Sequence, residues 1–322
     1  MSEPAPELPR QRVWPIFLLA AALATFGFQF VFFAPPEPTP EPSPRPDPFV
    51  ADQPEPIEIS PLSEPVTLSL GVADRSYTLD LRQSRTRGDH RVEAQIVVGV
   101  TDRMVADSEL PPGATSVIER RYDAAKVEVY DGEPRALAPQ ITLEVESLID
   151  TAIHRIAMAP TAEVVRSELV SSEVLQLRAT LTVLREAIDH LTPRLPREPV
   201  RQGESWSWDI PTSLSPWDED DELTTKLTGN ARMTARLLGA DPQGRPVLRL
   251  EIAGRHEGSS IDAEDHPVSL EYSTTGTGLV VWDAAFGQPL RSELVLAQDA
   301  RVDDVDIRTR HQLRLDRRDE PE

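Results

Sequence analysis

Histidine side chains are the first candidates for chemistry in this sequence, because imidazoles titrate near neutral pH and bind metal ions. None of the six belongs to a His-Glu-x-x-His motif, and no two lie four residues apart. His256 and His266 flank the segment HEGSSIDAEDH, whose acids could complete a divalent-metal site or simply form a polar hairpin loop. His311 interrupts an apolar stripe, and we expect a hydrogen-bonded histidine in the core or in the lining of a cavity.

The other sequence patterns that could indicate catalysis or ligand binding are either absent or also have a purely structural interpretation. It contains no Gly-x-Ser-x-Gly turn, and a hydrolase would need a serine, a histidine and an aspartate that meet only in the folded chain. Five acids at 218–222 offer oxygen ligands for calcium without the spacing of an EF-hand, or else form a solvated loop. Gly276 and Gly278 lack the third glycine of a dinucleotide loop and predict a bulge within a strand. The sequence therefore predicts no catalytic residue, no metal ligand and no cofactor.

Composition limits the classes of function further. The 322 residues include 33 Lys+Arg and 54 Asp+Glu, for a formal net charge of −21. Nucleic-acid binding needs clustered cations that displace phosphate counterions, so we predict no nucleic-acid partner. The chain has no cysteine, which excludes disulfides, thiol catalysis and cysteine-ligated zinc.

An uninterrupted apolar run near the amino terminus predicts a membrane anchor. Residues 13–33 contain no charge and span about 31 Å as a helix, enough to cross a hydrocarbon core of ~30 Å. Arg10 and Arg12 precede the run and acids follow it, which predicts a cytoplasmic tail at 1–12 and an exported, periplasmic carboxyl-terminal part. We therefore expect a single-pass protein of the inner membrane. The alternative is a cleaved signal peptide, with an Ala-x-Ala pattern at 22–24.

A proline-rich segment follows the apolar run. Residues 34–65 contain 12 prolines, which block helix and sheet and favour extended polyproline II. We expect a spacer that holds the exported domain away from the membrane. A docking track for a proline-recognising partner is the alternative.

Alternating apolar and polar residues dominate residues 66–318, the predicted exported domain. Such alternation is typical of strands with one wet face and indicates an antiparallel sheet. The clearest runs lie at 77–82, 92–100, 141–146, 206–210, 231–237, 248–252, 268–272, 290–296 and 305–315. We predict a mainly antiparallel β fold (α+β), in which a long meander forms a half-barrel or a sandwich.

One helix is predicted at about 172–191, and it carries the candidate ligand face. Its apolar residues recur at spacings of 4, 3, 4 and 3, with serine caps at 171–172 and Pro193 after the end. We expect this stripe to pack on the concave face of the meander rather than to form a coiled coil. Trp206, Trp208 and Ile210 share a strand face that either packs in the core or stacks on a sugar or a lipid. The candidate ligand-face residues are Leu177, Leu181, Leu184, Ile188, Trp206 and Trp208.

Two segments resemble a group of uncharacterised bacterial envelope proteins. They are LPREPVRQGESWSW at 195–208 and GTGLVVWDAAFGQPLRSEL at 276–294. In that group an "LP…PV..G..W" segment precedes a carboxyl-terminal β-meander with "G.G….D…G.L". The resemblance implies an exported all-β or α+β domain over about residues 66–316 and implies no activity. Those proteins are usually secreted or lipid-anchored, and this chain departs from them by its predicted transmembrane anchor.

The function predicted from these observations is non-enzymatic binding in the cell envelope. Many half-apolar strands and one amphipathic helix suit a domain that binds an apolar ligand, such as a lipid, or an envelope protein partner. A structural or assembly scaffold of the envelope and an envelope hydrolase remain as alternatives.

Overall fold

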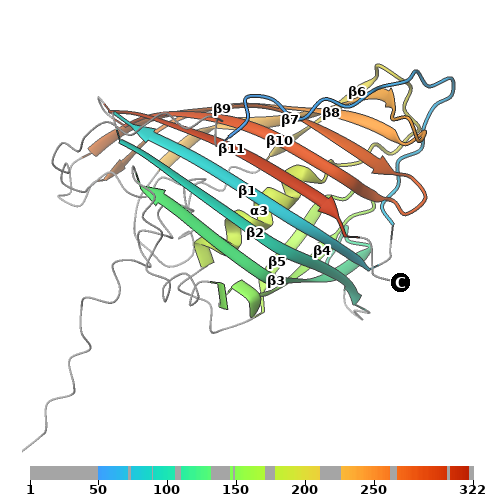
Figure 1. Ribbon diagram of the computed structural model, residues 1–322, viewed down its shortest axis with the longest axis horizontal. Coiled ribbons are helices and arrows are strands. Elements are labelled where there is room, and N and C mark those ends of the chain that lie inside the picture. The colour runs from blue at the N-terminus through green and yellow to red at the C-terminus, as the bar shows by residue number, and fades with distance from the viewer. Residues whose placement is uncertain are drawn as a thin grey trace, which may run out of the picture.

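A single antiparallel sheet dominates the computed structural model of the protein (Figure 1). The structure describes residues 50–71, 74–88, 90–105, 110–131, 146–147, 149–170, 178–210, 226–261, 267–302 and 305–318. Within these ranges the strands are β1 Arg75–Arg87, β2 His90–Val105, β3 Ser116–Asp131, β4 Ile153–Met158, β5 Val164–Leu169, β6 Ser205–Ile210, β7 Lys226–Ala240, β8 Pro246–Ile261, β9 Pro267–Asp283, β10 Gln288–Val302 and β11 Val305–Arg317. The predicted run at 141–146 lies almost wholly outside the described residues.

The strand order is β5-β4-β3-β2-β1-β11-β10-β9-β8-β7-β6, so two meanders meet where the first strand pairs with the last. At this seam Tyr77 lies opposite Arg317, and Arg87 lies opposite Ile307. The described strands form one open sheet with β5 and β6 at its edges, which confirms a mainly antiparallel fold. The sandwich alternative is wrong, because hydrogen bonds connect all eleven described strands in a single sheet.

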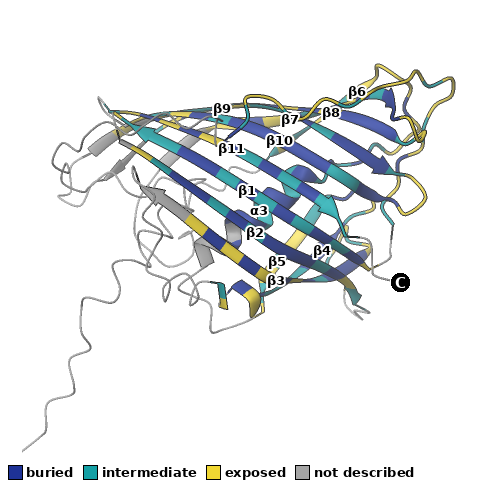
Figure 2. Ribbon diagram, in the orientation of Figure 1, coloured by how far each residue is buried: buried dark blue, intermediate teal, exposed yellow. Residues whose placement is uncertain are grey.

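The predicted period of two is visible along the strands (Figure 2). In β1 the side chains of Tyr77, Leu79 and Leu81 are buried, while their neighbours are only half-buried. We call the face that carries these residues the inner face. Most apolar inner-face side chains of the long strands belong to one hydrophobic cluster, which is the core of the domain, while Ile118 packs with Ile156 and Met158 in a smaller cluster.

Strands β3, β4 and β5 do not appear among the predicted runs. In β3 the buried positions change phase, from Ile118 and Tyr122 to Ala125 and Val127. The cause is a bulge at Ala124, whose φ of 50° lies in the left-handed region and whose register shifts against β2. A constant alternation of buried and exposed residues therefore cannot describe β3. Strands β4 and β5 are only six residues long, which is too short for a clear alternating pattern.

Helix α3, Arg178–Leu191, packs on the inner face against β10 and β11. Figure 1 shows it behind the central strands, on the side to which the sheet curves. Leu181, Leu184 and Leu191 are fully buried, as expected for an apolar stripe that faces a sheet. The end at Leu191 matches the prediction, and the amide of Thr192 donates to the carbonyl of Ile188 over 2.9 Å. Residues 171–177, with the predicted serine caps and Leu177, lie outside the described residues.

The glycines at 276 and 278 do not form the predicted bulge. Both lie in regular register within β9, between β8 and β10. A Cβ atom at Gly276 would lie 2.4 Å from Cδ2 of Leu296, and one at Gly278 would lie 2.5 Å from the carbonyl oxygen of Glu293. The glycines are needed because neighbouring strands pack closely against them, and not because a bulge inserts an extra residue there.

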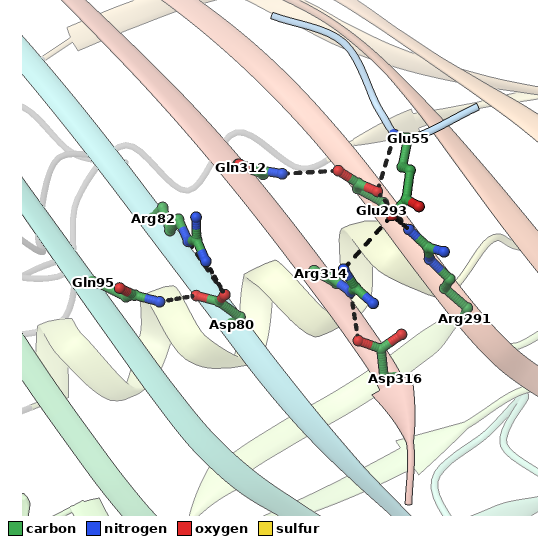
Figure 3. A network of polar contacts seen from close by, with 9 residues as sticks. All are labelled: Glu55, Asp80, Arg82, Gln95, Arg291, Glu293, Gln312, Arg314 and Asp316. Carbon is green, nitrogen blue, oxygen red and sulfur yellow. Dashed lines mark hydrogen bonds and ion pairs between the residues drawn. The ribbon is translucent and has the colours of Figure 1, made fainter. Parts of the chain in front are cut away.

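The first part of the segment 50–71 lies on the outer face of the sheet, opposite α3, whereas Leu68 near its end is buried in the core cluster. The amide of Ala51 donates to the side chain of Gln312, and that of Glu55 donates to Glu293. Further along, Ser60 pairs with Ala240 as an isolated bridge. Figure 3 shows part of this contact, with Glu55 above a group of charged side chains on β10 and β11. Contact with the sheet thus begins well before the domain start predicted at residue 66.

Residues 1–49 lie outside the described residues, and with them the predicted tail at 1–12, the apolar run at 13–33 and the first half of the proline-rich spacer. Among the helices of the described part of the chain, none combines the length and apolar character that a membrane crossing requires.

Candidate functional site

A cavity of about 330 Å³ lies beside α3 on the inner face of the sheet. Val164 and Val165 of β5 line one side, and Trp208 and Ile210 of β6 line another, so the two open edges of the sheet both reach it. The last turns of α3 contribute Ile188 and the charged or polar side chains of Arg185, Glu186, Asp189 and His190. Its volume is that of a site for a small molecule.

Charged residues of β1, β2 and β3 form one wall of the cavity, and His154 of β4 continues their row beyond the lining. Arg75 of β1 lies opposite Asp102 of β2, Asp102 lies opposite Arg120 of β3, and Arg120 lies opposite His154 of β4. All four are buried on the inner face. Arg120 donates to both oxygens of Asp102, from Nε over 2.8 Å and from Nη2 over 3.0 Å. Burial lowers the pKa of Arg120, but the charge and hydrogen bonds of Asp102 outweigh that effect and raise it, so the guanidinium stays charged.

Asp189 of α3 faces this wall between two arginines. One carboxylate oxygen lies 3.8 Å from Nη1 of Arg120, and the other lies 3.9 Å from Nε of Arg185. These distances are too long for hydrogen bonds. Burial raises the pKa of Asp189, although the charges of Arg120 and Arg185 act in the opposite direction. Nη1 of Arg120 and Nε of Arg185 are both buried and have no hydrogen-bond partner in the structure.

Neutral polar groups surround the charged wall. The hydroxyl of Tyr122 lies 3.0 Å from Nδ1 of His154, and Nε2 of His311 lies 2.9 Å from Oε1 of Gln298. Burial, followed by the charges of Arg120 and Arg185, lowers the pKa of His154 to about 3. Burial also lowers the pKa of His311 to about 3, with a smaller effect from His190. Burial likewise lowers the pKa of His190 to about 4 and lowers that of His256, the two histidines of the lining, so the arginines are the cationic groups of the cavity.

Apolar side chains complete the cavity on the side of the second meander. This part of the lining consists of Trp208, Ile210, Ala231, Ile252 and Leu296. The described lining from β6 to β10 thus carries no charged side chain, although His256, Tyr272, Thr274 and Gln298 add polar groups to it, whereas β1, β2, β3 and α3 supply a charged part. Such a division suits a molecule that is itself apolar at one end and polar at the other.

The structure divides the predicted ligand face. Ile188 and Trp208 line the cavity. Leu181 and Leu184 are fully buried in the core beneath it, where they support α3. Trp206 is half-buried against the core, and its Nε1 donates to the carbonyl of Arg194 over 2.7 Å.

The histidine predictions have different outcomes. His311 is buried and hydrogen-bonded, as predicted. His256 lies inside β8, which continues to Ile261, so the predicted hairpin loop is shorter than the segment between the two histidines. His266 and the acids at 218–222 lie outside the described residues. Among the residues that the structure describes, no three or more His, Asp or Glu side chains cluster as metal ligands would.

The charged wall is the part of the site that the sequence prediction missed. Its signal is present in the alternation: Arg75 continues the inner-face phase of Tyr77 and Leu79, and Asp102 continues that of Val98 and Val100. When a charged residue occupies one of these alternating positions near the end of a strand, the sequence alone suggests that the strand has left the core there. Only the register across four strands brings these residues together.

Comparison with known proteins adds little. No protein-family model and no curated protein matches the chain. Among solved structures, the transport unit of the autotransporter AIDA-I from Escherichia coli is similar at 7% sequence identity, over 77% of this chain and 90% of that chain, with a TM-score of 0.20. A likeness of this size supports no argument about fold or function.

Proposed function

We propose that this protein binds a small amphipathic molecule, such as a single-chain lipid, in the cavity between α3 and the two edges of the sheet. The observation that carries the proposal is the divided lining, in which Trp208, Ile252 and Leu296 face an apolar part and Arg120 and Arg185 face a charged part. The open sheet then acts as a half-barrel around the ligand, with α3 as its inner support.

We propose further that residues 13–33 anchor the protein in the inner membrane, with the binding domain on the periplasmic side. The 21-residue apolar run and the charge asymmetry around it support this orientation. A membrane anchor would keep the cavity close to a source of amphiphiles. Protease treatment of spheroplasts tests the orientation: we expect cleavage of the domain in intact spheroplasts, and protection would contradict it.

Native mass spectrometry of the full chain, purified from membranes and released from nanodiscs, tests the binding function. We expect the mass of one retained amphiphile per chain, recoverable by solvent extraction. A bare chain that also takes up no added dodecanoate would overturn the proposal and favour the scaffold.

Two valines provide a matched pair of variants for this experiment. Val165 and Val170 are both exposed, at 39% and 55%, but only Val165 lines the cavity. We expect Val165→Asp to reduce the retained ligand because it places a hydrated charge at the rim, while Val170→Asp retains the wild-type amount. Equal retention in the two variants would contradict the location of the site.

A further inference from the structure

Two guanidinium nitrogens in the described lining of the cavity are buried and lack a hydrogen-bond acceptor, and Oγ of Ser167 is a further lining atom without a partner. Nη1 of Arg120 and Nε of Arg185 are each without a hydrogen-bond partner, and the Arg120 side chain is only 6% exposed. They come from different elements, β3 and α3, and both residues line the cavity. Asp189 lies near both, at 3.8 and 3.9 Å, which leaves the two donors close to one another around a single carboxylate.

The orientation of Arg120 is determined by Asp102. The two hydrogen bonds to that carboxylate hold the guanidinium plane, so that Nη1 points away from Asp102. Folded proteins rarely keep a buried donor unpaired, so each such donor needs an explanation, and a bound water, ion or ligand group is one of them. Arg120 is therefore preorganised for an acceptor that none of the described residues supplies.

We propose that Arg120 and Arg185 bind the anionic oxygen head group, a carboxylate or a phosphate, of the amphiphile in the cavity. This inference rests on the proposed function and specifies its ligand class. Guanidinium N–H groups form their strongest hydrogen bonds with such oxygens. The apolar part of the cavity takes the chain of the same molecule, so recognition of the head and burial of the tail occur in one site.

Asp189 acts as an internal counterion while the head group is absent. At its distances from the two arginines it neutralises charge without occupying their donors. A second anion beside Asp189 is repelled by it, so this aspartate weakens binding of the head group. The raised pKa of Asp189, caused by burial, reduces that repulsion because its carboxyl takes up a proton more readily.

Isothermal titration of the full chain in phosphatidylcholine nanodiscs tests this inference, with empty nanodiscs as the blank. The probes are dodecanoate, dodecyl phosphate and dodecanol, which share one chain length and differ in the head group. We expect at least one of the two anions to bind about tenfold more tightly than the alcohol. Whichever anion binds more tightly identifies whether the site prefers a carboxylate or a phosphate, and either preference supports the proposal.

Three substitutions separate head-group recognition from loss of structure. Arg185→Gln is expected to weaken the anion about tenfold and leave dodecanol unchanged, whereas Arg249→Gln, at an exposed position outside the cavity, changes neither. Asp189→Asn is expected to tighten the anion about threefold, a direction that unfolding cannot mimic.

The outcomes distinguish the inference from the function on which it rests. Equal affinity for the anions and the alcohol, or equal weakening of both by Arg185→Gln, would overturn the head-group assignment and leave amphiphile binding intact. Failure of all three probes to bind would overturn the proposed function itself.

Discussion

Tyr122 and His154 form a buried hydrogen bond between β3 and β4, with 3.0 Å between the phenolic oxygen and Nδ1. The two rings meet edge to face, with their planes at 83°. Burial raises the pKa of Tyr122 and lowers that of His154, so both groups are neutral at physiological pH. This neutral pair lies directly beside the Arg120–Asp102 ion pair. Protonation of His154 would add a positive charge near the positive charges of Arg120 and Arg185.

Acid is therefore expected to destabilise the fold through its buried histidines. The pKa of His154 is about 3 in the folded protein, below the ~6.5 of an unfolded chain. Stability is full above pH ~6.5 and is lost as the pH falls from there towards 3, because only the unfolded chain binds the proton in that window. We expect about 2 kcal/mol of loss per such histidine between pH 7.5 and 5.0. His311, also with a pKa of about 3, contributes in the same sense.

Urea unfolding of wild type and His154→Gln at the two pH values checks this expectation. The difference in unfolding free energy between pH 7.5 and 5.0 should be about 2 kcal/mol smaller in the variant, whatever its stability at neutral pH. An unchanged difference would show that His154 does not titrate as its burial implies.

We expect removal of one partner of the Arg120–Asp102 pair to lower the free energy of unfolding strongly, and replacement of both partners by apolar residues to lower it much less. Asp102→Ala leaves a buried guanidinium without its carboxylate and should destabilise the fold by about 3–5 kcal/mol. The double variant Arg120→Met, Asp102→Leu removes both charges and should regain most of that loss. Urea unfolding of Arg120→Met, Asp102→Leu and the double variant measures the coupling. Additive losses would contradict a direct pairing of the two side chains.

Helix α3 is expected to contribute to stability through its buried leucines. Leu184 is fully buried against the sheet, so Leu184→Ala should cost about 2–5 kcal/mol through lost burial and the cavity that remains. Leu110 is 43% exposed, and Leu110→Ala should cost less than about 0.5 kcal/mol. Thermal unfolding compares the pair, and similar losses would mean that α3 does not pack as described.

Glu293 is expected to hold residues 50–58 on the outer face. Its carboxylate accepts from the amide of Glu55 over 3.2 Å and from the side chain of Gln312 over 2.8 Å, as Figure 3 shows. Glu293→Ala should cost about 1–3 kcal/mol and speed amide hydrogen exchange in residues 50–58. Glu251→Ala, at an exposed ion pair on β8, serves as the control. Wild-type exchange rates in Glu293→Ala would show that other contacts hold the segment.

Most of the sheet could be predicted because its strands keep one phase. β11 alternates throughout: its buried residues are Ile307, Thr309, His311, Leu313 and Leu315, and the residues between them are more exposed. The turn residues Asp241, Pro242, Gln243 and Gly244 indicate the hairpin between β7 and β8, where the amide of Gly244 donates to the carbonyl of Asp241 over 2.9 Å. β3 could not be predicted in this way, because its bulge at Ala124 interrupts the phase.

The sequence by itself determined the class of the fold, the carboxyl end of the helix and the burial of His311, because these depend on local periodicity and on breakers such as Pro193. Only the tertiary structure decided the site. The pairing of β1 with β11, whose partners are 220 or more residues apart in the chain, joins two meanders into one sheet. Register across β1 to β4 then aligns Arg75, Asp102, Arg120 and His154, and α3 brings Arg185 and Asp189 to them. Contacts between residues so distant in the chain leave no local pattern, because each strand's alternation specifies which face a side chain occupies but not which neighbour it meets.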